Sequence, residues 1–136
     1  MIKPWRATCM QVYCYLVNSA NNREEAMVMV NRAIDRWIEL IRSVARGGPP
    51  QLVLFPEFAL TGYPIRESAE EWIEKACIEI PGPETGRLQA EAQRSKLWIA
   101  AHSYEKDATW PGRSAGTRGD VLNVGDLGLD RLCTLR

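Results

Sequence analysis

One glutamate in this sequence stands where α/β proteins commonly place an active site. Glu57 follows the apolar segment 52–55 and Pro56, and it precedes a turn-rich stretch at 60–64. Pro56 lacks a backbone donor and fixes φ, so we expect a buried strand to end there. An apolar flank would raise the pKa of the Glu57 carboxyl and suit it to general-base catalysis. The alternative is a solvated or helix-capping glutamate at a strand end.

Two other side chains could belong to the same site. Tyr63 follows a glycine and precedes a proline, so its phenol could line a pocket above Glu57. The alternative is a turn tyrosine that packs over the end of the sheet. His102 is the only histidine and ends an apolar segment, where a hydrogen-bonded packing role is more frequent than catalysis. Without a second histidine or a Cys–His pattern, the sequence indicates neither a metal site nor a papain-like site.

The cysteines and glycines complete no recognisable cofactor motif. The cysteines are Cys9, Cys14, Cys77 and Cys133. None of them forms a Cys-x-x-Cys pair, and no signal peptide is evident, so free and mostly buried thiols are expected. The segment 82–86 lacks the lysine and the spacing of a phosphate-binding loop, and no Gly-x-Ser-x-Gly sequence occurs.

The composition is that of an ordinary globular domain. The 136 residues suffice for one small domain, with 46% hydrophobic and 25% charged residues. Lys+Arg and Asp+Glu both number 17, so the zero net charge argues against nucleic acid or an anionic membrane as a partner. The apolar segments are too short to span a bilayer. A cytoplasmic location is therefore expected.

The first half of the sequence has a strand–helix–strand pattern that would position Glu57. Residues 7–12 and 51–55 are nearly continuously apolar, as in strands buried on both faces of a sheet. Between them, Asn22 and Glu25 have the spacing of a capping box, and apolar residues recur at helical spacing to about residue 45. This order predicts a βαβ unit with parallel strands.

The pattern then repeats before the composition changes. Helices are expected from 68 to 77 or 78 and over 85–95, and a third strand over 97–103. The fold class is therefore α/β. Beyond residue 107 the stretch 109–119 has loop composition, and 121–124 could form one short strand in an otherwise irregular tail.

The glutamate segment resembles a known family. Residues 52–64, LVLFPEFALTGYP, are similar to the catalytic-glutamate segment of the nitrilase superfamily, the carbon–nitrogen hydrolases. The segments 80–85, IPGPET, and 97–106, LWIAAHSYEK, are similar to the helix and strand that follow it. The resemblance covers about residues 7–113, so we expect a partial carbon–nitrogen hydrolase domain at 1–113 and an unlike tail at 114–136.

The resemblance implies a fold and a mechanism. The fold would be the first half of an α-β-β-α sandwich, and the activity would be hydrolysis of non-peptide carbon–nitrogen bonds in small amides or nitriles. Family members use a Glu–Lys–Cys triad without metal or organic cofactor, and full-length members typically form homo-oligomers. Only Glu57 carries over, as the general base, and Tyr63 matches the Gly-Tyr-Pro turn near the substrate.

The sequence departs from the family after the third expected strand. No lysine follows Lys106, which comes too early for the family motif, and Cys133 lacks the expected surroundings. A truncated or frame-shifted reading frame beyond Arg113 would explain this, and the chain alone would then be inactive. The alternatives are a non-catalytic α/β fragment or interaction module, and a flavodoxin-like ligand binder at the strand ends.

Overall fold

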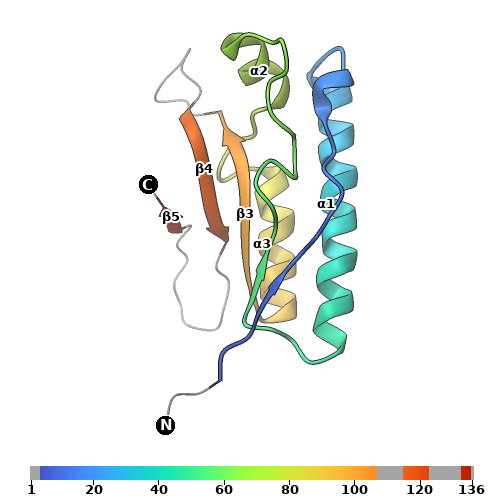
Figure 1. The fold of residues 1–136 in the computed structure, drawn as a ribbon, viewed down its shortest axis with the longest axis vertical. Helices are drawn as coiled ribbons and strands as arrows, with labels where there is room; N and C mark the ends of the chain where they lie inside the picture. The colour runs from blue at the N-terminus through green and yellow to red at the C-terminus, as the bar shows by residue number, and fades with distance from the viewer. Residues whose placement is uncertain (1–3, 107–114, 123–132, 136) are drawn as a thin grey trace.

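The computed structural model describes residues 4–106, 115–122 and 133–135, with side chains described for the first of these ranges (Figure 1). Its elements are β1 (Ala7–Cys9), the 3-10 turn η1 (Val17–Ser19), α1 (Arg23–Arg46), β2 (Leu52–Leu54), α2 (Ala69–Ala76), α3 (Pro83–Ser95), β3 (Trp98–Glu105), β4 (Ala115–Leu122) and β5 (Cys133–Leu135).

The strands form one sheet in the order β1-β2-β3-β4-β5. β2 pairs in parallel with β1 and with β3, so both expected crossovers are present: α1 joins β1 to β2, and α2 and α3 join β2 to β3. The α/β class is therefore confirmed. β4 and β5 add antiparallel strands at the β3 edge.

The expected capping residues begin the first two helices. The Asn22 side chain accepts from the Glu25 amide at 2.9 Å, while the Glu25 carboxylate returns to the amide of Asn21 instead of Asn22. Ser68 and Glu71 form a complete capping box at the start of α2. The third helix starts at Pro83, two residues earlier than expected, because proline is well suited to a first helical turn.

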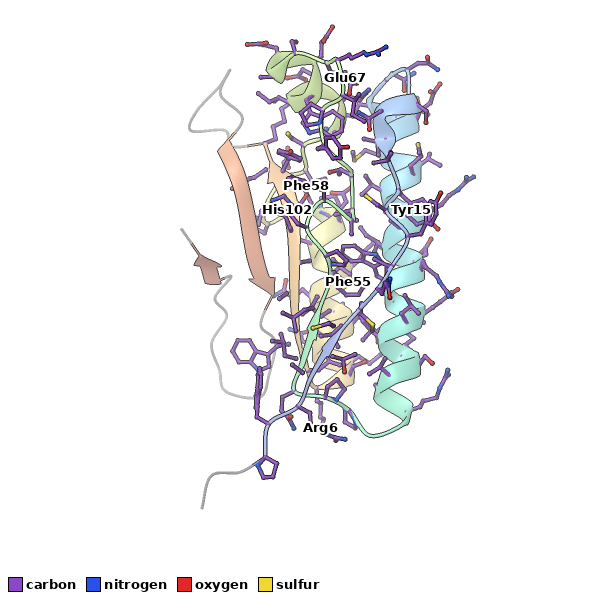
Figure 2. The ribbon with its side chains drawn as sticks, in the orientation of Figure 1. Arg6, Tyr15, Phe55, Phe58, Glu67 and His102 are labelled. Carbon is purple, nitrogen blue, oxygen red and sulfur yellow. The ribbon has the colours of Figure 1, made fainter. Side chains whose placement is uncertain are left out.

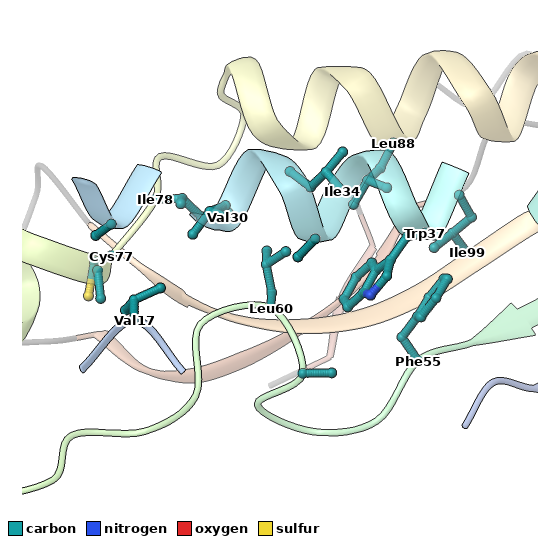
Figure 3. Close-up of a cluster of buried hydrophobic side chains, with 14 of the residues drawn as sticks. Val17, Val30, Ile34, Trp37, Phe55, Leu60, Cys77, Ile78, Leu88 and Ile99 are labelled. Atoms are coloured by element: carbon teal, nitrogen blue, oxygen red, sulfur yellow. The ribbon is translucent and has the colours of Figure 1, made fainter. Parts of the chain in front are cut away.

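The core lies between the sheet and the two long helices. Val53 of β2 and Ile99 of β3 are register partners, are fully buried and face α1 and α3. In α1 the buried residues recur at helical spacing: Ala26, Val30, Ala33, Ile34, Trp37 and Ile41. Trp37 stacks on Phe55 with the ring centroids 3.9 Å apart and 10° between the planes (Figure 3). The stack fixes the end of β2 against α1.

The opposite face of β1 and β2 is only partly covered. Ala7 and Cys9 are exposed, and Leu52 and Leu54 are partly exposed, whereas Val53 between them is fully buried. The expectation of strands buried on both faces is therefore wrong within the described residues. Because neighbouring side chains of a strand point to opposite faces, one layer of helices buries only every second residue.

The expected loop at 109–119 is also partly wrong. Residues 115–119 belong to β4, which pairs with β3 in a register that places His102 opposite Gly119. The edge of β3 offers backbone hydrogen bonds that override the weak strand propensity of this glycine-containing segment. Leu122 ends β4 inside the short strand expected at 121–124, and residues 123 and 124 lie outside the described residues.

Candidate active site

The carboxyl end of β2 leads into a tight turn that carries Glu57. Phe55 is buried and its amide donates to the Ala100 carbonyl at 2.9 Å, so the chain stays fixed to β3 beyond the strand. The Ala59 amide then donates to the Pro56 carbonyl at 3.4 Å, which closes the turn. Glu57 itself is exposed. The expected apolar flank is absent because the side chain stands on a turn beyond the strand.

The backbone of the next residue is held by hydrogen bonds from both sides. Phe58 has φ of 57°, a left-handed conformation that is uncommon for a residue with a side chain. Its amide donates to Nδ1 of His102 at 3.3 Å, and its carbonyl accepts from the Cys14 thiol at 2.9 Å and from the Gly62 amide at 2.8 Å. The turn that carries Glu57 is therefore tied to β3 and to the segment after β1.

His102 is a half-buried packing residue, as expected, and it lies beside Phe58 (Figure 2). The rings of His102 and Phe58 meet edge to face with their centroids 4.8 Å apart. The ring of Tyr104 also meets the imidazole edge to face, with the centroids 5.8 Å apart. Burial lowers the pKa of His102, although the Glu57 carboxylate acts in the opposite direction. The imidazole is therefore neutral at neutral pH, and Nδ1 can accept the Phe58 amide hydrogen.

Tyr63 lies next to this turn. Its ring is half exposed and tilts against Phe58 with the centroids 5.8 Å apart. Its carbonyl accepts from the Asn18 side chain at 3.0 Å, which connects the turn to η1. A hollow of about 20 Å³ beside Leu60 and one of about 510 Å³ beside Glu67 are lined by neither Glu57 nor Tyr63.

Within residues 4–106, whose side chains are described, no lysine or cysteine is in contact with the Glu57 carboxylate. Lys106 pairs with Glu74 of α2 at 2.9 Å, so it has a structural partner. Cys133 belongs to β5, and its side chain lies outside the described residues. Cys14 reaches the same turn, but its thiol donates to a backbone carbonyl, and burial raises its pKa.

The remaining cysteines and acidic residues form no second site of this kind. Cys9 is exposed, whereas Cys77 is buried and burial raises its pKa to about 11. Of the three cysteines whose side chains are described, Cys77 alone is fully buried as expected. Among the described residues, no group of three or more His, Cys, Asp and Glu side chains is arranged to hold a metal ion. No described helix is long and apolar enough to cross a membrane.

Sequence reasoning missed the contact of Cys14 with this turn and a partly buried ion pair nearby. Lys75 of α2 pairs with Glu67, and it also donates to the carbonyls of Asn18 and Ala20. Lys75 is 55 or more positions away from the two carbonyls in sequence, and Glu67 and Cys14 lie in irregular segments. No local periodicity therefore indicates these contacts. They anchor the end of the Glu57 loop to η1 and α2.

Residues 28–124 match the family model of carbon-nitrogen hydrolases. An amidase from Nesterenkonia sp. aligns with a TM-score of 0.60 and 15% identity, over 86% of this chain and 37% of the amidase. An N-terminal amidase with an Asn-Glu peptide aligns with a TM-score of 0.58 and 17% identity, over 85% of this chain and 24% of that protein.

A third solved structure gives the same result. A double mutant of the amidase from Nesterenkonia sp. AN1 in complex with acrylamide aligns with a TM-score of 0.60 and 14% identity, over 89% of this chain and 40% of the mutant. No curated protein matches the chain. The chain spans less than half the length of each of these amidases. The fold is the first half of a nitrilase-like α-β-β-α sandwich, and the chain belongs to the carbon-nitrogen hydrolase family.

Proposed function

We propose that this chain supplies the general base, Glu57, of an enzyme that hydrolyses the carbon–nitrogen bond of small carboxamides. The observation that supports the proposal most is the position of Glu57. Glu57 is exposed on a hydrogen-bonded turn at the carboxyl end of β2, which pairs in parallel on both sides. It also lies within residues 28–124, which match the family model. Ligands of open α/β sheets bind at this edge.

The chemistry needs a base, a nucleophile and a group that stabilises negative charge. Glu57 would take the proton of a cysteine thiol, and the thiolate would attack the amide carbon. Glu57 would then give that proton to the amide nitrogen, so that the carbon–nitrogen bond breaks, ammonia leaves and a thioester remains. A lysine would stabilise the charge that develops on the oxygen. Hydrolysis of the thioester by water, again with Glu57 as base, would release the carboxylic acid. Nitriles are the alternative substrate class.

The lysine and the cysteine have no recognisable counterpart in this sequence, so we propose that the chain by itself does not hydrolyse amides. Ammonia release from acrylamide or propionamide should stay at the level of a protein-free control, and Glu57→Gln should change nothing. Ammonia release that Glu57→Gln abolishes would show that the chain holds a working site of its own.

The role of Glu57 itself is tested on the gene. The nucleotide sequence beyond the codon for Arg113, translated in every frame, should encode the lysine and cysteine motifs of the family. A polypeptide extended in that frame should hydrolyse amides, and Glu57→Gln should lower kcat about 100-fold or more. Absence of both motifs from every frame would contradict the proposal.

A specific observation also favours a second candidate, an interaction module. Cys9 is exposed and Leu54 partly exposed on the open sheet face, and the large side chains of Trp5 and Tyr13 are 63% and 85% exposed. Exposed apolar surface of this kind is typical of a face that another chain covers. Sedimentation and unfolding of the purified chain discriminate between the two candidates. A monomer that unfolds in one sharp transition would favour an independent module, and aggregation would favour a fragment of a larger enzyme.

A further inference from the structure

The residue after Glu57 is held in an uncommon backbone conformation. Phe58 has φ of 57°, and the loop between β2 and α2 holds two further residues of positive φ, Gly62 at 79° and the exposed Arg66 at 62°. A side chain at positive φ is strained, and such a residue persists only when its surroundings over-determine it. The direction of the Glu57 side chain depends on this turn, because the two residues share a peptide unit.

Two side chains provide that constraint, and each comes from a different part of the fold. Nδ1 of His102, on β3, accepts from the Phe58 amide at 3.3 Å. The Cys14 thiol, on the segment after β1, donates to the Phe58 carbonyl at 2.9 Å. Both partners lie 44 residues from Phe58, one before it and one after it. We call these two contacts the Phe58 clamp.

The clamp requires one protonation state of each partner. A protonated imidazole has no acceptor, and a thiolate has no hydrogen to donate. Burial lowers the pKa of His102 and raises the pKa of Cys14, so the environment favours the neutral imidazole and the neutral thiol. The Glu57 carboxylate on the turn acts on the imidazole, Tyr104 of its own strand contacts it, and Glu84 of α3 lines the same small hollow as His102.

The tautomer also follows from the contacts. Since Nδ1 accepts a hydrogen bond, the hydrogen of the neutral imidazole is on Nε2, a buried atom that has no hydrogen-bond partner among the described residues. A histidine that only packs could form its hydrogen bond through either ring nitrogen. Here the imidazole leaves its donor unsatisfied while its acceptor holds the turn.

We propose that His102 and Cys14 are positioning residues for the general base: through the Phe58 clamp they fix the turn that directs Glu57. The inference rests on the proposed function of Glu57, since without that role the clamp would only stabilise a turn. Neither residue touches the reacting atoms, and both act through the backbone of Phe58.

The unmodified chain provides the first test. His102 is the only histidine, so the imidazole signals of a proton–nitrogen correlation spectrum belong to it. The Nε2–H tautomer should dominate at neutral pH. The Phe58 amide shift should titrate with the His102 midpoint, below its usual value, and should still do so in Glu57→Gln. An Nδ1–H tautomer, or a Phe58 amide that does not follow the imidazole, overturns the proposal.

Matched substitutions provide the second test. His102→Phe keeps a ring and removes the acceptor, whereas His102→Asn places a carbonyl oxygen near the position of Nδ1. The Phe58 amide should exchange with solvent roughly threefold to tenfold faster in His102→Phe, and His102→Asn should restore most of the protection. Cys14→Ala should loosen the Glu57 and Phe58 amides in nitrogen relaxation, and Cys14→Ser should restore them.

Equal protection of Phe58 in His102→Phe and the unmodified chain would refute the clamp. If a variant fails to fold, the tautomer and titration of the unmodified chain still decide. Failure of the proposed function has a different signature, because Glu57→Gln would then leave amide hydrolysis by the extended polypeptide unchanged while the Phe58 clamp persisted.

Discussion

Replacement of Trp37 tests whether the end of β2 is fixed by the core as described. The indole is fully buried and stacks on Phe55, two residues before Glu57. Removal of a buried tryptophan side chain to alanine costs about 3–5 kcal/mol, because apolar contact is lost and a cavity remains. Trp37→Ala should therefore remove a large part of a stability that is typically about 5–15 kcal/mol.

The same side chain gives an internal control. The indole Nε1 is buried without a hydrogen-bond partner among the described residues, and an unmet donor of this kind costs about 1–3 kcal/mol. Trp37→Phe keeps an aromatic ring against Phe55 and removes that donor, so it should stay within about 1.5 kcal/mol of the parent. The matched surface control is Trp5→Ala, at a residue that is 63% exposed, with an expected change under about 0.5 kcal/mol.

Urea unfolding followed by far-ultraviolet circular dichroism measures all three variants, with the slope checked for constancy. Two results would refute the reasoning. A loss below about 1 kcal/mol in Trp37→Ala would mean that the indole is not packed in the core. A loss in Trp37→Phe as large as in Trp37→Ala would mean that the indole donor is satisfied.

Three further substitutions test the elements around the site. Ser68→Ala removes the capping box of α2 and should cost about 1 kcal/mol in urea unfolding; an unchanged midpoint would contradict the cap. Gly62→Ala places a side chain at φ of 79° and 2.6 Å from a Leu16 methyl carbon, so it should lower the melting temperature, and a rise would show that the turn differs. Glu91 is buried, which raises its carboxyl pKa, but hydrogen bonds from Arg94, Arg42 and Ser95 outweigh this and lower it. A lowered folded-state pKa stabilises the protein above the unfolded value and loses that effect as pH falls through the folded value, so Glu91→Gln should flatten the acid side of the stability profile. A steeper acid side would contradict it.

The elements that local signals define could be predicted from the sequence. Asn22 and Ser68 begin their helices as expected, because a capping side chain bonds to backbone only three residues away. β4 could not be predicted in full, because its strand conformation depends on pairing with β3 and not on its own residues. The partly uncovered face of β1 and β2 was missed because a nearly continuous apolar segment does not show whether a layer covers each face of the sheet.

The candidate site was predictable only in part for the same reason. Glu57 and its turn are encoded within thirteen residues, 52–64, so they were identified from sequence. The sequence left open whether Glu57 has an apolar flank or is solvated, and the structure shows it exposed, because exposure depends on how the chain leaves the strand. Cys14 and His102 meet Phe58 across 44 residues of sequence, and no periodicity or spacing rule indicates such a contact.

The measurement that tests the central claim most directly is amide hydrolysis by the extended polypeptide in three forms: unmodified, Glu57→Gln and Glu39→Gln. Glu39 is an exposed glutamate of α1 that pairs with Arg36 and serves as the matched control. If Glu57 is the general base, kcat falls about 100-fold or more in Glu57→Gln and stays near the parent value in Glu39→Gln. Equal rates in all three forms would contradict the role of Glu57.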